Sequence, residues 1–301
     1  MKKQTTNSLR PKRVCAIHDL SSFGRCALTV VIPTLSSLGI QCVPLPTALM
    51  STHTGGYTDI YMRELSSDMK GMYSHWEALG IDFDAIYSGF VLDAAQGHII
   101  ADLIKRFRRE GTLVLVDPVM GDDGEYYSTC TPEMKDIMGE LCSQADLITP
   151  NLTEACILCD IEYPKDNTMS KARALEFSDE LLCRLCERSP KVAITGIPYT
   201  DGTDEYVLTA CADAGIGHRA YFAQKKVGAS YPGTGELFSS VLLGLLLDGE
   251  DFFPACDFSG KFVAETILLS EEYGDATRHG TALEPALMKL AHDTYEKTLC
   301  K

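Results

Sequence analysis

Short apolar segments alternate with longer amphipathic segments along most of the chain. This alternation predicts a mainly parallel β-sheet that is covered by helices on both faces, a three-layer α/β/α sandwich. The longer segments, for example 94–110 and 171–187, carry apolar residues at helical spacing. No internal repeat or linker interrupts the pattern, so we expect residues 1–301 to form a single domain. The predicted strands are 14–17, 42–44, 85–88, 113–116, 147–149, 192–195, 205–210 and 219–223.

Three parts of the chain depart from this alternation. Residues 1–13 are polar and basic, which predicts an N-terminal tail outside the sheet. The strands 205–210 and 219–223 flank a Gly-containing loop without a helix, which predicts an antiparallel hairpin. From Glu236 onward the pattern predicts helices alone.

The composition is that of a soluble globular chain, with 45% hydrophobic and 23% charged residues. Forty-two acidic residues against 27 basic ones give a net charge of −15. Because such a surface repels phosphate backbones, we expect no nucleic-acid partner. No apolar run reaches the roughly 18 residues of a membrane span, and no signal-peptide core follows the N-terminus. We therefore expect a cytoplasmic protein without a membrane partner.

Two Cys-x-x-Cys pairs among the twelve cysteines leave two interpretations open. Cys156 with Cys159, and Cys183 with Cys186, match the spacing of a four-cysteine zinc site. Both pairs lie in segments with helical patterns, where cysteines three residues apart share one face of the helix. Buried reduced thiols are the simpler interpretation, and a structural zinc protein is the alternative.

The segment Gly233-Thr234-Gly235-Glu236 precedes an apolar helix. Backbone N–H groups at a helix start, together with the helix dipole, favour an anion such as a phosphate or a phosphoryl transition state. A carboxylate at Glu236 could then take a proton from an attacking hydroxyl. The structural alternative is a capped helix, with Thr234 as N-cap and Glu236 in the first turn.

Two other strand ends carry groups that suit a cation. Asp117 closes an apolar strand, and Asn151 and Glu154 stand three residues apart at a helix start. Magnesium in proteins is bound by few side-chain oxygens and several waters, which these residues could provide. The alternatives are a turn that begins at Asp117 and a capping box formed by Asn151 and Glu154.

The turn predicted after the first strand (18–25) and the segment 51–56 after the second strand are rich in hydrogen-bonding groups and glycine. Such segments at strand ends commonly hold a small polar substrate, although a lone histidine such as His53 is more often structural. The chain lacks GxxxxGK[ST], HExxH, GxSxG and GxGxxG motifs. Phosphate chemistry would therefore need another architecture.

Five motifs in order resemble the ribokinase-like superfamily, and within it the pyridoxal/pyridoxamine (vitamin B6) kinases. They are Ser-Ser-x-Gly at 21–24, Ser-Thr-His-Thr at 51–54, Asp-Pro-Val-Met-Gly-Asp at 117–122, Thr-Pro-Asn-x-x-Glu at 149–154 and Gly-Thr-Gly at 233–235. The resemblance runs from about Val14 to Leu290. It implies a ribokinase-like fold, often a homodimer, that uses ATP, Mg²⁺ and a monovalent cation such as K⁺.

The implied reaction is phosphorylation of the 5′-hydroxymethyl group of pyridoxal, pyridoxamine or pyridoxine. By position, the resemblance places the anion hole at Gly233, Thr234 and Gly235, the general base at Glu236, the vitamer site at Asp19, Ser21, Thr52 and His53, nucleotide and cation contacts at Asp117, Thr149, Asn151, Thr195, Lys226, Val227 and Tyr231, and the Mg²⁺ region at Asp117, Asn151 and Glu154.

The chain departs from the family at the general base, where Glu236 stands in place of aspartate. The additional methylene moves the carboxylate by about 1 Å, and a displacement of that size can cost on the order of 10²-fold in rate. A protein that binds vitamers without turnover is therefore an alternative.

Two further hypotheses concern the substrate. A hydroxymethylpyrimidine kinase of thiamin synthesis is the second alternative, although Phe23, Arg25 and Cys26 replace the small residues of that enzyme's first turn. Cys130 lies in a segment that could cover the site and meet the pyridoxal aldehyde.

Overall fold

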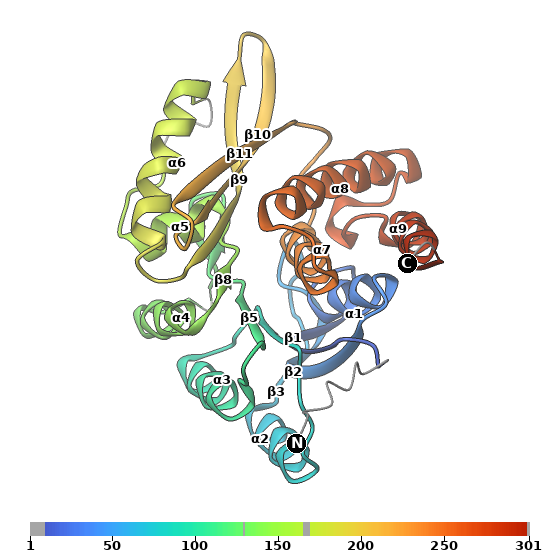
Figure 1. Cartoon of the computed structure of the whole chain (residues 1–301). Coiled ribbons are helices and arrows are strands. Elements are labelled where there is room, and N and C mark those ends of the chain that lie inside the picture. The colour runs from blue at the N-terminus through green and yellow to red at the C-terminus, as the bar shows by residue number, and fades with distance from the viewer. Residues whose placement is uncertain (1–9, 129, 165–168, 300–301) are drawn as a thin grey trace, which may run out of the picture.

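The computed structural model describes residues 10–128, 130–164 and 169–299, and most of its strands join in one sheet (Figure 1). The strands of that sheet are β1 (Arg13–Phe23), β2 (Gln41–Thr52), β3 (Met62–Glu64), β4 (Ala85–Ser88), β5 (Leu113–Val116), β8 (Leu147–Ile148), β9 (Lys191–Asp201), β10 (Asp204–Asp213) and β11 (His218–Lys225). Two short strands, β6 (Gly121–Asp122) and β7 (Glu125–Tyr126), form a separate hairpin. The described residues thus form a nine-stranded sheet in the order β11-β10-β9-β8-β5-β4-β1-β2-β3.

The strands at the centre of the sheet are parallel and those toward its edges are antiparallel. All pairings from β9 through β8, β5, β4 and β1 to β2 are parallel. The strands β3, β10 and β11 pair antiparallel with their neighbours. The carboxyl ends of the central strands therefore meet at one edge, where open α/β sheets bind ligands.

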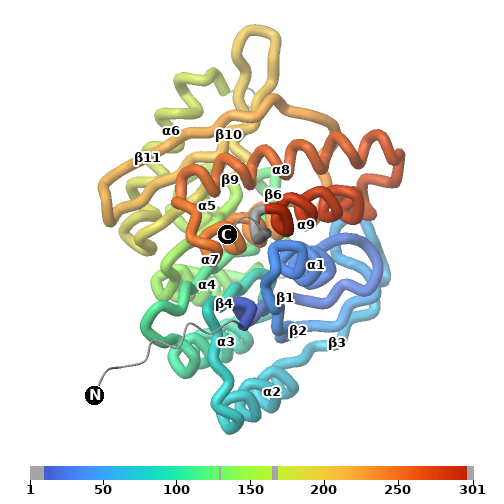
Figure 2. The backbone as a smooth tube through the Cα atoms, turned by 45° about the vertical axis from the view of Figure 1, so that its right-hand side comes forward, coloured from blue at the N-terminus to red at the C-terminus, as the bar shows by residue number. Residues whose placement is uncertain are grey.

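Helices cover both faces of this sheet. The described helices are α1 (Leu28–Ser37), α2 (Ser66–Ala78), α3 (Ala94–Phe107), α4 (Pro132–Gln144), α5 (Leu152–Cys159), α6 (Lys171–Leu185), α7 (Thr234–Asp248), α8 (Phe252–Tyr273), the 3₁₀ turn η1 (Thr277–His279) and α9 (Leu283–Leu299). Helices α2 to α6 share a buried core with one face of the sheet, and α1, α7, α8 and α9 share a core with the other (Figures 1 and 2). The predicted three-layer α/β/α sandwich is confirmed. None of the described helices is both long and apolar enough to span a bilayer.

Each strand divides its side chains between the two cores because successive residues of a strand point to opposite faces. In β4, Ile86 packs with the core of α2 to α6, and Tyr87 packs with the core of α1, α7, α8 and α9. The same alternation continues to the strand ends. It places the side chains of His18 and Tyr87 on the face that α7 covers, where their ring centroids lie 4.4 Å apart in an edge-to-face arrangement.

The strand predictions are correct in place and often too short. Both β4 and β5 have their predicted ends, and β10 and β11 form the predicted antiparallel hairpin. The expected turn at 18–25 is wrong in its first part, because β1 continues through Phe23. Its partner β2 continues to Thr52, and the two strands pair up to Phe23 and Thr52. This pairing holds polar residues in a strand despite their modest β propensity.

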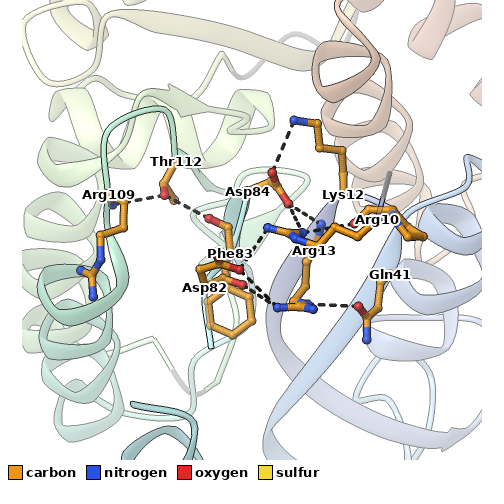
Figure 3. Close-up of polar contacts among 10 residues, drawn as sticks. Arg10, Lys12, Arg13, Gln41, Asp82, Phe83, Asp84, Arg109 and Thr112 are labelled. Atoms are coloured by element: carbon orange, nitrogen blue, oxygen red, sulfur yellow. Dashed lines mark hydrogen bonds and ion pairs between the residues drawn. The ribbon is translucent and has the colours of Figure 1, made fainter. Parts of the chain in front are cut away.

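The prediction that residues 1–13 lie outside the sheet is wrong at Arg13. Residues 1–9 lie outside the described residues, whereas Arg13 begins β1. Arg10 binds Asp84 at 2.8 Å and Asp82 at 3.0 Å, and Arg13 binds Asp82 at 3.3 Å (Figure 3). Although burial raises the pKa of Asp84, the N–H of Arg13 and the guanidinium of Arg10 hold it below its usual value. These ion pairs lie at the amino ends of β1 and β4, away from the candidate site.

Both Cys-x-x-Cys pairs belong to helices, as the helical pattern predicts. Cys156 and Cys159 lie in α5, Cys183 lies in α6, and Cys186 is the C-cap of α6. Among the described residues no group of three or more His, Cys, Asp or Glu side chains could hold a metal ion. The zinc alternative is therefore wrong for these four cysteines.

Candidate active site

The carboxyl ends of β1, β4, β5 and β8 meet beneath the first turn of α7. The N–H of Asp117, directly after β5, donates to Ser88 O at 2.8 Å. The N–H of Thr149, directly after β8, donates to Val116 O at 3.2 Å. These backbone hydrogen bonds continue the sheet pairing by one residue beyond β5 and β8, and so fix the positions of Asp117 and Thr149.

The segment Gly233-Thr234-Gly235 forms the uncapped start of α7. Gly233 is the N-cap residue with φ +85°, and no side chain caps the helix. The Thr234 hydroxyl donates to Tyr231 O at 3.1 Å, so the alternative with Thr234 as N-cap is wrong. The first intrahelical bond runs from Leu237 N–H to Gly233 O. The N–H groups of the first turn before Leu237 therefore have no intrahelical partner, and the helix dipole favours an anion beside them.

The Glu236 carboxylate reaches back from α7 to the turn between β1 and α1. Its Oε1 accepts the N–H of Ala27 at 3.2 Å and lies 3.5 Å from Cys26 Sγ. In the described part of the structure Glu236 Oε2 has no hydrogen-bond partner. One oxygen of the predicted base is thus held, and the other is available to a ligand.

Asp117 is buried under α7 in a network of hydroxyl groups. The Ser239 hydroxyl lies 2.8 Å from Thr149 Oγ1 and 3.4 Å from Asp117 Oδ2. Burial raises the pKa of Asp117 well above its usual value, and the nearby charge of Glu236 raises it further. A carboxylate in this environment gains from a cation, because a cation offsets both effects.

Asn151 and Glu154 form the capping box of α5. The Asn151 Oδ1 accepts the Glu154 N–H at 2.9 Å, and Glu154 Oε2 accepts the Asn151 N–H at 2.8 Å. Glu154 Oε1 accepts the N–H of Met120 at 3.1 Å, and the Asn151 amide donates to Gly121 O at 2.8 Å. The structural alternative for this pair is present, and its role near Mg²⁺ stays a prediction.

The predicted vitamer residues lie at the ends of β1 and β2. The Ser21 hydroxyl donates to Asp19 Oδ2 at 2.8 Å. Burial raises the pKa of Asp19 to about 6, against the lowering effect of the Ser21 hydrogen bond. Thr52 is half-buried and pairs with Phe23.

Both ring nitrogens of His53 are engaged. Because Nδ1 accepts the N–H of Gly55 at 3.1 Å, the proton belongs on Nε2, which donates to Arg278 O at 2.7 Å. This is the structural role that a lone histidine most often has. A vitamer contact by His53 would use the ring face and stays a prediction.

The predicted nucleotide residues are more dispersed than the catalytic ones. Thr195 in β9 pairs with Asn151 through a backbone bridge, so it adjoins the capping box. Lys226 is exposed, and its Nζ binds Glu205 Oε2 at 2.8 Å. Val227 is half-buried and Tyr231 is buried. The contacts among the described residues do not join Lys226 or Val227 to Asp117.

Several buried polar residues that lie at the candidate site beneath α7 were not singled out from the sequence. Ser239 and Ser240 interrupt an otherwise apolar helix, which is the signal that could have singled them out. The hydroxyls of Tyr87 and Ser240 and both ring nitrogens of His18 are buried without a hydrogen-bond partner in the described structure. Burial lowers the pKa of His18 to about 3, so its ring is neutral.

The sequence profile of the phosphomethylpyrimidine kinase family matches residues 31–281, more than half of the chain. The chain belongs to this family. Within the family, a pyridoxal kinase PdxY of Pseudomonas aeruginosa is 30% identical over 276 residues, 88% of this chain and 91% of the relative. A pyridoxine/pyridoxal/pyridoxamine kinase of Bordetella avium is 26% identical over 84% of each chain. The resemblance to ribokinase-like B6 kinases is confirmed.

Crystal structures of similar proteins have the same fold. A candidate phosphomethylpyrimidine kinase of Bacteroides thetaiotaomicron, crystallised with pyridoxal, is 37% identical and has a TM-score of 0.86 over 93% of this chain and 96% of that one. The pyridoxal kinase of Lactobacillus plantarum is 26% identical and has a TM-score of 0.82 over the same shares.

Proposed function

We propose that this chain is an ATP-dependent kinase that phosphorylates the 5′-hydroxymethyl group of a vitamin B6 vitamer in the salvage of pyridoxal 5′-phosphate. The observation that carries the proposal is the position of the Glu236 carboxylate. It lies in the first turn of α7, beside N–H groups that no side chain caps, and close enough to Asp19 and Asp117 to raise the pKa of both. A hydroxyl acceptor and a phosphoryl group would meet at this point.

In the reaction the vitamer hydroxyl oxygen bonds to the γ-phosphorus of ATP as the bond from that phosphorus to the ADP oxygen breaks. The hydroxyl proton passes to Glu236 Oε2. General-base catalysis of this kind contributes about 10²–10⁴-fold. The N–H groups of Gly233, Thr234 and Gly235 stabilise charge on the transferring phosphoryl group, and positioning supplies much of the remaining rate.

Asp117 is the residue that best fits a magnesium ligand. It is buried, burial raises its pKa, and its Oδ1 has no hydrogen-bond partner among the described residues. The oxygens of Asn151 and Glu154 already accept backbone N–H groups, so they would act through water. We propose that Asp117 holds Mg²⁺ and that Thr149 and Asp117 hold K⁺. These cations, when bound, neutralise charge on the triphosphate.

We assign the vitamer site to Asp19, Ser21, Thr52 and His53. We assign nucleotide contacts to Thr195, Lys226, Val227 and Tyr231. The assignment of Asp19 is supported by the nearby charge of Glu236, and that of Ser21 by its hydrogen bond to Asp19. The pyridoxal in the similar Bacteroides crystal structure and the pyridoxal kinases of Pseudomonas support the substrate class.

We also propose that residues 1–301 form one domain and that the protein is a cytoplasmic homodimer. One sheet continues from β3 to β11, which supports the single domain. Met62 in the edge strand β3, and Tyr61 directly before it, expose large apolar side chains, which supports that edge as the interface. Light scattering tests the dimer, and Met62→Lys should shift the mass toward the monomer.

The proposed reaction is tested by ADP release with Mg²⁺ and K⁺ in the presence of pyridoxal, pyridoxamine, pyridoxine or hydroxymethylpyrimidine. Turnover of a B6 vitamer is the expected result. Turnover of the pyrimidine alone would assign the chain to thiamin synthesis. Vitamer binding without ADP release would make the chain a binding protein, with the longer side chain of Glu236 as the reason.

A further inference from the structure

The turn that joins β1 to α1 contains a strained residue. Ala27 has φ +52° and ψ −130°, and the Thr29 N–H donates to Cys26 O at 3.2 Å. Ala27 is thus the second residue of a β-turn that requires positive φ, a position that favours glycine. A non-glycine residue in such a conformation costs about 1–3 kcal/mol and persists only where its surroundings enforce it.

The turn is fixed on both sides. The Thr29 Oγ1 accepts the N–H of Cys26 at 3.0 Å, and the Arg25 N–H donates to His279 O at 2.9 Å. The first bond closes the turn on itself, and the second ties it to η1.

Two donors of this turn converge on one oxygen. The Ala27 N–H and the Cys26 thiol lie 3.2 Å and 3.5 Å from Glu236 Oε1. Burial raises the pKa of Cys26 well above its usual value, and the charge of Glu236 raises it further, so the sulfur keeps its proton and can donate. The strained backbone therefore serves a contact with the predicted general base.

We propose that Cys26 and Ala27 are positioning residues that hold Glu236 Oε1 and thereby direct Oε2 to the acceptor hydroxyl. Glutamate has one more rotatable bond than the aspartate of the family, and a base displaced by about 1 Å loses on the order of 10²-fold in rate. The two hydrogen bonds to Glu236 Oε1 restrict rotation about the additional bond of the glutamate side chain. This inference rests on the proposed kinase function.

The test is a kinetic cycle. Cys26→Ala and Cys26→Ser are prepared with Glu236 intact and together with Glu236→Asp, and kcat and KM for pyridoxal and ATP are measured. Cys42→Ala, a half-buried thiol in β2, is the matched control. We expect Cys26→Ala to lower kcat about 3–10-fold, the range of one weak hydrogen bond, without changing either KM. Cys26→Ser should keep most of kcat, because its hydroxyl also donates.

In the Glu236→Asp background Cys26→Ala should have no further effect, because the shorter carboxylate does not reach the thiol. Two results would overturn the inference in favour of simple packing. One is an unchanged kcat for Cys26→Ala. The other is an equal loss of kcat for Cys26→Ala and Cys26→Ser, both with Glu236 intact and with Glu236→Asp.

Absence of vitamer-dependent ADP release by the unmodified protein would instead reject the proposed function. In that case the midpoints of urea denaturation test the contact between Cys26 and Glu236. Changes in stability for Cys26→Ala and Glu236→Gln that do not add in the double variant support the contact, and additive changes overturn it.

Discussion

The carbonyl oxygen of Arg25 lies 2.4 Å from the position that a Cβ atom on Gly233 would occupy. Gly233 also has φ +85°, which disfavours any other residue there. Gly233→Ala should therefore separate the β1–α1 turn from the start of α7. We expect a loss of more than 2 kcal/mol in the free energy of unfolding, measured by urea denaturation, and a large loss of kinase activity.

Gly235→Ala is the matched stability control for this prediction. A Cβ at Gly235 has its nearest contact with Asp117 Oδ2 at 4.0 Å, and its φ is not positive. We expect its free energy of unfolding to stay within about 0.5–1 kcal/mol of the unmodified protein. Equal losses for the two variants would contradict the role of the Arg25 carbonyl.

Asp117→Asn should raise stability and lower activity. A carboxyl group whose folded pKa is raised gives stability at low pH that is lost as the pH rises from its unfolded to its folded pKa. Asparagine avoids this loss, so the variant should be more stable than the unmodified protein at pH 7.5 in the absence of cations. Its kcat should fall by at least about 10²-fold.

Thermal unfolding and ADP release measure these two effects, with the exposed Asp136→Asn as control. A less stable Asp117→Asn protein would show that Asp117 serves the fold rather than a cation.

Asp19→Asn should alter the pH dependence of stability. The pKa of Asp19 rises from an unfolded value near 4 to about 6, so folding binds a proton between these values. The Asp19 contribution is present below pH 4 and is lost as the pH rises through 6. Relative to the unmodified protein, Asp19→Asn should gain on the order of 2–3 kcal/mol between pH 4 and pH 7.

Urea denaturation at half-unit pH steps measures this difference. Parallel pH profiles for the two proteins would rule out a raised pKa at Asp19.

Ala27→Gly should stabilise the fold. Relief of the positive φ gains about 1–3 kcal/mol, and the freer unfolded chain costs about 0.5–1 kcal/mol. We expect a net gain of about 1 kcal/mol in the free energy of unfolding. The control Ala95→Gly, at an exposed position in α3, should lose about 0.5–1 kcal/mol. A loss at both positions would show that Ala27 carries no strain.

The sequence pattern predicts the central strands well because burial on both faces makes them purely apolar. The strands β4 and β5 have their predicted bounds for this reason. The pattern fails where pairing overrides composition, as in the polar second half of β1, which only its partner β2 keeps extended.

The candidate site was predictable where it consists of local motifs and unpredictable where it depends on tertiary contact. Asp117 and Glu236 stand in short motifs at a strand end and a helix start. The contact between Cys26 and Glu236 joins positions 210 residues apart, and only the packing of α1 against α7 creates it. Ser239 connects Thr149 and Asp117 in the same way, through a helix face that turns inward.

The most direct test of Glu236 as the general base compares pyridoxal-dependent ADP release by the unmodified protein and by Glu236→Gln. Glutamine keeps the size of the side chain and removes its basicity. We expect pyridoxal 5′-phosphate and ADP in equal amounts from the unmodified protein, and a kcat about 10²–10⁴-fold lower for Glu236→Gln, with thermal unfolding showing that the variant is folded. A kcat within a few-fold of the unmodified protein would contradict the assignment of Glu236 as the general base.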